Sequence, residues 1–178
     1  MKIVELGSII QTFRSRSPKG YLNSLDPDSL PYIDVDFLRS GLPKRFVNKN
    51  NPVICDPGEV VMISVGSSTG FVNQIPLRSV VGNNLMKVTS SELTNDYLFY
   101  FLRDNYQTLN NLAQGTSIPF LNMKVLNTLK VPLPSLDEQQ KLVEPLVLLD
   151  AEGGASSVFR NSADSIKKQF SRKPLKAS

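Results

Sequence analysis

The sequence predicts an α+β protein: a globular mixed α/β domain over residues 1–135, followed by a C-terminal helical arm with a basic tail over residues 136–178. Three observations support this class. Short apolar runs bounded by Gly, Pro and Asp fill the first half of the chain, as in strands joined by turns. Helical spacing of apolar residues begins near residue 94. A helix-capping motif at residue 135 then opens a segment with a leucine stripe.

The N-terminal segments are predicted as strands separated by loops. Lys2–Phe13 has the pattern of a strand, or of a strand entering a helix, with a turn at Gly7-Ser8. Residues 15–31 are rich in Ser, Pro, Asp and Gly and are predicted as a loop. Pro31–Asp36 alternates large and acidic residues, as an exposed edge strand would. A polar loop over residues 41–52 follows.

A hairpin is predicted in the middle of the chain. Val60–Val65 follows a turn and is predicted as a buried strand, and Phe71–Ile75 returns beside it. The two glycines of Gly66–Gly70 permit positive φ at the reversal between them. Backbone amides of such a segment could also cradle a phosphate. It lacks the Lys-Ser/Thr of a nucleotide-binding loop and lies between strands, so we interpret it as a hairpin turn.

The pattern then changes to a helical one. After a strand at Asn84–Val88, Thr94 or Asn95 can cap a helix that has Asp96 in its first turn. The residues on its apolar face are Leu98, Phe101, Leu102 and Leu109. A loop at Gln114–Pro119, a helical turn at Asn122–Leu126 and a strand at Leu129–Leu133 complete the predicted domain.

The arm begins with a capping box, in which Ser135 and Glu138 satisfy each other's backbone amides. Pro145 is expected to kink or break the helix near Lys141, and Gly153-Gly154 is a second break. A further helix is expected after it. We expect the apolar faces of the arm to bind a partner or a second copy of the chain through Leu142, Leu146, Leu149, Phe159, Ile166 and Phe170.

Composition excludes several kinds of chemistry. The chain has 178 residues, no His and one Cys, Cys55. A Ser-His-Asp triad, a Cys-His dyad, a histidine base and a Cys/His zinc site are therefore excluded. An internal disulfide is impossible, which fits a reducing cytoplasm. The longest apolar runs have four residues, so we expect no membrane span, and the N-terminus does not have the pattern of a signal peptide.

The positive charge of the chain lies in its tail. Residues 151–178 hold six Lys or Arg and two acidic residues, which accounts for the whole net charge of +4 and leaves residues 1–150 neutral. Two loops of the neutral domain nevertheless gather basic and amide side chains. These are Arg14, Arg16 and Lys19 in the first loop, and Lys44, Arg45, Asn48, Lys49, Asn50 and Asn51 in the second. Ordinary surface charge is the alternative explanation.

Other candidate groups are weaker. Asp34 and Asp36 would share one face of the predicted strand, as a metal-binding or acid/base pair requires, but no partners for them are evident and we expect no metal site. Cys55 has no local base and is expected to be inert. Motifs of adenine methyltransferases and of nucleases are absent from the sequence.

The order of these segments resembles a target-recognition half of the specificity subunit of type I restriction-modification systems. The resemblance covers residues 1–149, and its most telling part is the strand-to-helix junction Val131–Gln140. The other matching segments are Val4–Gly7, Leu30–Asp36, Gly58–Ser64, Gly66–Gly70, Asn83-Asn84, Tyr97-Leu98 with Tyr100 and Leu102, Gln114–Pro119 and Leu126. Family members usually carry two recognition domains and two spacer helices, whereas this chain has one of each.

The resemblance implies a DNA-reading module that does no chemistry. Double-stranded DNA is its implied ligand, with a modification subunit that brings S-adenosylmethionine and a restriction subunit that brings ATP and Mg²⁺. Basic loop residues would hold phosphates and polar loop residues would read bases. The first group is Arg14, Arg16, Lys19, Lys44 and Arg45, and the second is Asn48, Asn50, Asn51, Gln114, Thr116 and Ser117.

One recognition domain in a family that reads two half-sites implies a homodimer, joined through residues 136–171. Its DNA site would then be an interrupted palindrome. Two other classes of function stay open. One is a regulatory or scaffold protein that binds the methylation machinery without reading DNA. The other is a small enzyme that uses Asp34 and Asp36 or the glycine hairpin.

Overall fold

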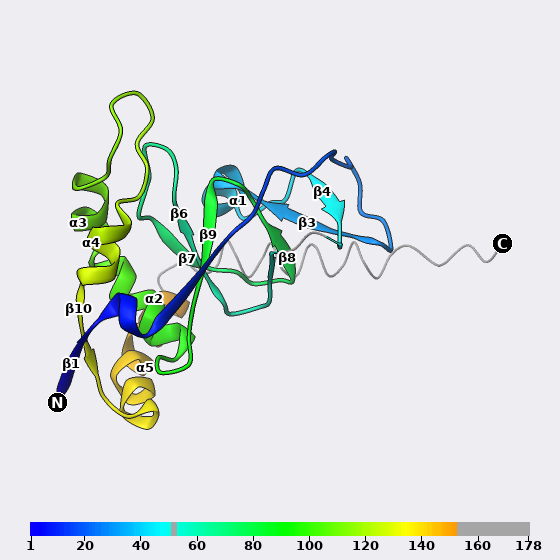
Figure 1. Cartoon of the computed structure of the whole chain (residues 1–178). Coiled ribbons are helices and arrows are strands. Elements are labelled where there is room, and N and C mark those ends of the chain that lie inside the picture. Colours follow the sequence, from blue (N-terminus) through cyan, green and yellow to red (C-terminus); the bar gives the residue numbers. More distant parts are fainter. Residues whose placement is uncertain (51–52, 153–178) are drawn as a thin grey trace.

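The computed structural model describes residues 1–50 and 53–152 (Figure 1). Two of its sheets have four strands each. The one with the longer strands, called the larger sheet below, is antiparallel, with strand order β2-β9-β6-β7. These strands are β2 (Ile10–Arg14), β6 (Val60–Ile63), β7 (Val72–Gln74) and β9 (Leu85–Ser90). A second sheet has the order β4-β3-β8-β5, with a parallel step between β3 and β8. Its strands are β3 (Ser29–Ile33), β4 (Phe46–Asn48), β5 (Ile54–Cys55) and β8 (Ser79–Val81).

Helices follow the sheets in the second half of the chain. A short 3-10 helix, η1 (Leu6–Ser8), and α1 (Val35–Ser40) lie in the first half. The others are α2 (Asn95–Asp104), α3 (Tyr106–Asn111), α4 (Met123–Thr128) and α5 (Leu136–Glu152). A small two-stranded sheet pairs β1 (Lys2–Glu5) with β10 (Lys130–Leu133), which brings the first strand of the chain beside the start of α5 (Figure 1).

The core lies on both faces of the larger sheet, because β6 is apolar at every position. Val60 and Met62 pack in one cluster with Leu98 of α2. Val61 and Ile63 point to the other face, where they pack with residues of the second sheet. Successive side chains of a strand face opposite ways, so an unbroken apolar run marks a strand that is covered on both sides.

Several local predictions are confirmed. Thr94 caps α2 by accepting the Tyr97 amide, and the predicted strands at residues 60–65 and 129–133 correspond to β6 and β10. The capping box also forms: the Glu138 carboxylate accepts the amide and hydroxyl of Ser135, each at 2.9 Å. These hydrogen bonds lower the pKa of Glu138 below its ordinary value.

The prediction of an exposed edge strand at Pro31–Asp36 is wrong. β3 is internal, paired with β4 on one side and β8 on the other, and Tyr32 and Ile33 are buried. Asp34 has left the strand and caps α1, where its carboxylate accepts the Phe37 amide at 2.9 Å. The acidic residues that suggested alternation are therefore helix-entry residues.

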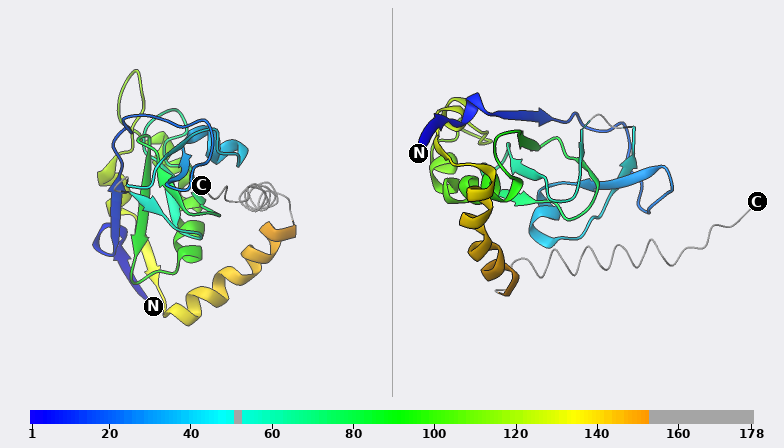
Figure 2. Two further views of the ribbon diagram at one scale, coloured as in Figure 1. Left: turned by 90° about the vertical axis from the view of Figure 1, so that its right-hand side faces the viewer. Right: turned by 90° about the horizontal axis from the view of Figure 1, so that it is seen from below.

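Of the two outcomes predicted at Pro145, a kink or a break near Lys141, the break does not occur, because α5 continues from Leu136 to Glu152 and Figure 2 shows it as one ribbon. Pro145 is exposed, so water can satisfy the carbonyl that the missing N–H leaves free. Gln139 and Val143 of α5 are buried against the domain, whereas the leucine stripe is not. Gly153-Gly154, Phe159, Ile166 and Phe170 lie outside the described residues, as does Asn51.

Candidate nucleic-acid interface

The register of the larger sheet brings several loops to one end of it. Ile63 pairs with Leu85, and Arg14 pairs with Met86. The hairpin that follows β6, the turn that precedes β9 and the segment that follows β2 must therefore emerge together. We call this surface the loop edge and define it as residues 14–20, 64–70, 82–84 and 113–120. It lies along the upper side of the molecule in Figure 1.

Hydrogen bonds join the four segments of the loop edge into one row. The Gly66 amide donates to the Pro119 carbonyl at 2.8 Å, which joins the hairpin to residues 113–120. The Ser64 amide donates to the Asn84 carbonyl at 2.9 Å. The Asn83 side chain donates to the Ser17 hydroxyl at 3.0 Å, which adds the segment after β2. The row is thus continuous from one end to the other.

The projecting loop at residues 113–120 is held at its base. Gln114 and Phe120 exchange backbone hydrogen bonds of 2.8 and 2.9 Å. Gly115 has φ 94°, a conformation that favours glycine, and a Cβ there would meet the Ile118 carbonyl at 2.5 Å. Thr116 and Ser117 are exposed, and Ile118 keeps 64% of its surface exposed. The projecting loop thus presents polar and apolar side chains from a base that backbone hydrogen bonds hold together.

The loop edge has no carboxylate. None of its four segments contains Asp or Glu, whereas Arg14, Arg16 and Lys19 are exposed within it. In residues 1–50 and 53–152, half of the Lys and Arg side chains have a carboxylate within 4.0 Å. Those without one are Lys2, Arg14, Arg16, Lys19, Arg39, Lys124 and Lys141. Unpaired positive charge therefore concentrates on and beside this edge.

The second predicted basic loop is arranged differently. Arg45 pairs with Asp34 at 2.5 Å and lies over the rings of Tyr21 and Tyr32, at 4.5 and 5.4 Å from their centroids. The hydrogen bond to Asp34 is the main cause that raises the pKa of Arg45. Lys44 lies 3.5 Å from Asp36. Both cations thus have partners within the protein.

The amide residues of that loop lie at the end of the β3–β4 pair that is farther from the loop edge. Asn48 pairs with Ser29 in the strand register, and its side chain accepts the Asn50 amide at 2.9 Å. Lys49 pairs with Asp28 at 2.6 Å. The structure therefore groups Arg14, Arg16 and Lys19 with Gln114, Thr116 and Ser117 on the loop edge, and sets Asn48 and Asn50 apart from it.

The carboxylates that suggested an enzyme do not form a catalytic pair. Asp34 caps α1 and pairs with Arg45, and Asp36 is exposed in the first turn of α1. In the described part of the chain, no three His, Cys, Asp or Glu side chains gather as a metal site would require. A groove of about 610 Å³ lies elsewhere, between β7, α2 and α5, where Gln74, Phe99 and Val147 are among its lining residues.

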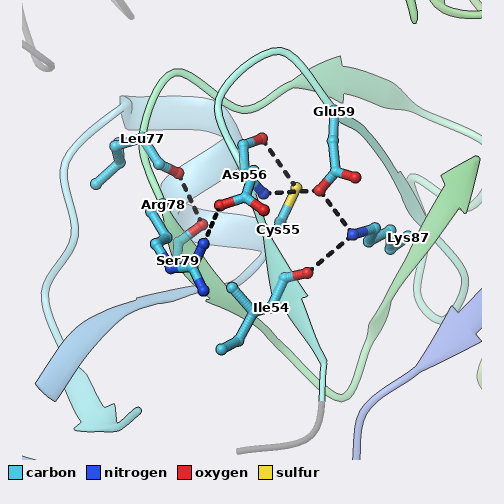
Figure 3. Close-up of polar contacts among 8 residues, drawn as sticks. All are labelled: Ile54, Cys55, Asp56, Glu59, Leu77, Arg78, Ser79 and Lys87. Carbon is cyan, nitrogen blue, oxygen red and sulfur yellow. Dashed lines mark hydrogen bonds and ion pairs between the residues drawn. The ribbon is translucent and has the colours of Figure 1, made fainter.

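Cys55 belongs to a polar cluster that connects the two sheets (Figure 3). Lys87 of β9 reaches the Glu59 carboxylate at 2.6 Å and donates to the Ile54 carbonyl of β5 at 3.0 Å. Asp56 pairs with Arg78 nearby. Burial is the main cause that raises the pKa of Cys55 to about 12, which favours the protonated thiol over the nucleophilic thiolate.

The outer face of α5 is apolar, and no other described segment covers it. Leu142 and Leu149 keep 57% and 63% of their surface exposed, and Leu146 keeps 39%. Among the described residues, the predicted leucine stripe is therefore exposed. Within residues 1–50 and 53–152, no helix has the length and apolar character needed to cross a membrane.

A family model agrees with the resemblance found in the sequence. The model of the type I restriction modification DNA specificity domain matches residues 1–153. The chain therefore belongs to this family.

Two curated relatives are specificity subunits from Methanocaldococcus jannaschii. The type I restriction enzyme MjaVIII specificity subunit is 25% identical over 148 residues, which is 82% of this chain and 35% of the relative. A protein named as the MjaX specificity subunit is 25% identical over 154 residues, with 84% and 36% covered. The chain thus spans about a third of the length of these relatives.

Solved structures show the same fold. A chain of a type I R-M system, solved to study complex assembly, aligns with a TM-score of 0.69 at 23% identity, over 94% of this chain and 42% of that one. The HsdS subunit from Thermoanaerobacter tengcongensis aligns at 0.65 and 22% identity, over 94% and 42%. The S subunit from M. genitalium aligns at 0.59 and 18%, over 87% and 41%. The predicted α+β class is confirmed.

Proposed function

We propose that this chain is a DNA-reading specificity subunit with a single recognition domain, and that it directs a type I restriction-modification enzyme without performing chemistry itself. The observation that carries the proposal is the loop edge. A continuous row of loops with unpaired cations and no carboxylate suits the phosphate backbone of DNA. Family membership supports the same function.

Two parts of the loop edge have different roles in this proposal. Arg14, Arg16 and Lys19 contact phosphates and set the position of the domain on the duplex. Gln114, Thr116 and Ser117 stand on the rigid projecting loop and hydrogen-bond base edges in the major groove. Lys44 and Arg45 act mainly within the protein, because each has a carboxylate partner.

The chain needs other subunits for methylation and cleavage. We place S-adenosylmethionine on a modification subunit, and ATP and Mg²⁺ on a restriction subunit. We further propose a homodimer that pairs the exposed leucines of α5 with those of a second copy. Its support is the exposed apolar face that α5 presents among the described residues.

Mapping of methylated bases, in cells that carry this chain with its modification partner, tests the proposal. A symmetric dimer should yield an interrupted palindrome, because two identical domains read two identical half-sites. A motif with two unrelated halves would contradict the homodimer. A regulatory or scaffold protein would yield no sequence preference, either here or when the chain selects from random duplexes, and would contradict DNA reading.

A further inference from the structure

Arg39 is a cation that the sequence patterns did not single out. It lies in the last turn of α1, is exposed and has no carboxylate within 4.0 Å among the described residues. Its guanidinium donates to the Ser68 hydroxyl at 3.0 Å. Ser68 belongs to the glycine hairpin of the loop edge, so a cation from another element is held against the middle of this surface.

The hairpin that holds Arg39 has unused backbone donors. The Thr69 amide donates to Gly66 and the Phe71 amide to Ser68, which closes two successive turns. The amides of Ser67 and Ser68 donate no hydrogen bond within the described residues. Consecutive free amides beside a guanidinium are a chemical combination that binds phosphate oxygens.

Hydrogen bonds from α3 and from the projecting loop also hold the hairpin in place. The Asn110 side chain donates to the carbonyls of Ser67 and Thr69, at 3.0 and 2.9 Å. The same hairpin binds the projecting loop through Gly66 and Pro119. A ligand at Ser67 and Ser68 would therefore be held in a constant position relative to the loop that we propose reads bases.

We propose that Arg39 and the Ser67–Ser68 turn form a binding site for one backbone phosphate of a DNA strand. The inference rests on the proposed function and adds to it a phosphate contact next to the reading loop. Arg14, Arg16 and Lys19 approach from the opposite end of the row, so the duplex is held on both sides of the turn at residues 82–84. A purely structural role for Arg39, as a cation at the C-terminus of α1, is the competing explanation.

The test measures binding of the full chain to a fluorescein-labelled duplex of fixed sequence, between about 50 and 200 mM salt. Arg39→Ala should lower the magnitude of the log–log salt slope by about 0.9, which is about an eightfold loss of affinity at about 0.1 M salt. Arg39→Lys keeps the charge and should keep the slope. Arg78→Ala is the matched control, because it removes another exposed arginine, away from the loop edge, and should leave the slope unchanged.

Ser68→Ala tests the positioning of Arg39. It keeps the charge but removes the hydroxyl that holds the guanidinium, so affinity should fall while the slope persists. Thermal melting by circular dichroism checks that each variant folds. If Arg39→Ala does not fold, Arg39→Lys and Ser68→Ala decide the matter, and wild-type affinity in Ser68→Ala overturns the proposed positioning.

The outcomes separate this site from the proposed function. If Arg39→Ala keeps the wild-type slope while Arg14→Ala/Arg16→Ala lowers it, the Arg39 site is overturned and DNA binding stands. If Arg39→Ala and Arg39→Lys lose the same affinity without a change of slope, the role is structural and the proposal fails. If the wild-type chain shows no salt-dependent binding, both proposals fail.

Discussion

Gln139 is a polar side chain with no exposed surface, and both ends of its amide are used. Its oxygen accepts the Thr94 amide at 2.8 Å. Its nitrogen donates to the carbonyls of Glu92 and Pro134, at 2.9 and 3.0 Å. One side chain thus joins the start of α5 to the residue that caps α2, and the two helices share an anchor.

Replacing Gln139 by Leu should destabilise the protein by about 3 kcal/mol, because buried backbone groups lose their partners. Gln140→Leu is the matched control, since Gln140 is exposed and its loss should change stability by less than about 0.5 kcal/mol. Urea unfolding of the two variants measures the difference. Equal stability of the two variants would refute the anchoring role.

Cys55 makes stability depend on pH in the alkaline range. Its pKa rises from 9.0 to about 12 in the folded chain, because burial disfavours the thiolate. The unfolded chain therefore loses its thiol proton first. The stability that this group contributes is complete below about pH 9 and is lost as the pH rises toward about 12.

Cys55→Ala should therefore unfold with a weaker pH dependence than the wild type. Between about pH 9 and 10 the wild type should lose up to about 1.4 kcal/mol more than the variant per pH unit. Urea unfolding at a series of pH values gives the comparison, and this window lies below the pKa of Tyr100, which is also raised to about 12. Parallel curves would show that Cys55 titrates normally.

At the scale of elements, α5 persists past Pro145 because both of its halves are attached to α2. Gln139 holds the first half. Asp150 holds the second, where it accepts the Tyr100 hydroxyl at 3.0 Å and the Arg103 guanidinium at 2.6 Å. Tertiary contacts therefore compensate for the loss of the hydrogen bond that proline cannot make. A sequence pattern cannot reveal such contacts.

Pro145→Ala should stabilise the second half of α5, since proline costs about 3 kcal/mol relative to alanine inside a helix. Amide hydrogen exchange at Leu146–Leu149 should slow. Glu144→Ala at the neighbouring exposed position controls for the gain in helix propensity and should change exchange little. Unchanged exchange in Pro145→Ala would mean that the helix already absorbs the proline without cost.

Elements with a strong local pattern could be predicted from the sequence, and those that depend on distant partners could not. The apolar run at Val60–Ile63 and the Ser135 capping box are local signals, and both formed as predicted. β5 has two residues and β8 has three, and each exists only through pairing with segments far along the chain. Asp34 was misread because strand alternation and helix capping place an acid at the same position.

At the scale of the whole molecule, the sequence could predict only part of the candidate interface on the loop edge. Composition picked out Arg14, Arg16 and the 114–117 loop but could not show that they belong to one row. The hydrogen bond from Asn83 to Ser17 spans 66 positions. Nor could composition show that Arg45 is paired, or that Arg39 reaches the hairpin.

The two ends of this row should respond differently to mutation. Arg14→Ala/Arg16→Ala should weaken binding to all duplexes and lower the salt slope by about one unit per lost phosphate contact. Gln114→Ala or Thr116→Ala should instead change the preference among sequences, by about 1–3 kcal/mol at the base that is read. Competition binding with a set of single-base variants of the target measures both effects. Uniform weakening by both kinds of substitution would contradict the division of roles.

The pairing of β1 with β10 has a further consequence. Lys2 lies opposite Leu133, so the chain enters the domain and leaves it at the same point (Figure 1). The residues between these two strands therefore begin and end at the same place. The distance between the chain before β1 and the chain after β10 does not depend on the sequence between the strands. Because α5 is attached to α2 through Gln139 and Asp150, a different domain between the same two strands would keep α5 in place only if it kept these contacts. The two strands thus fix the point where the chain enters and leaves the domain, and α2 fixes the direction in which α5 continues.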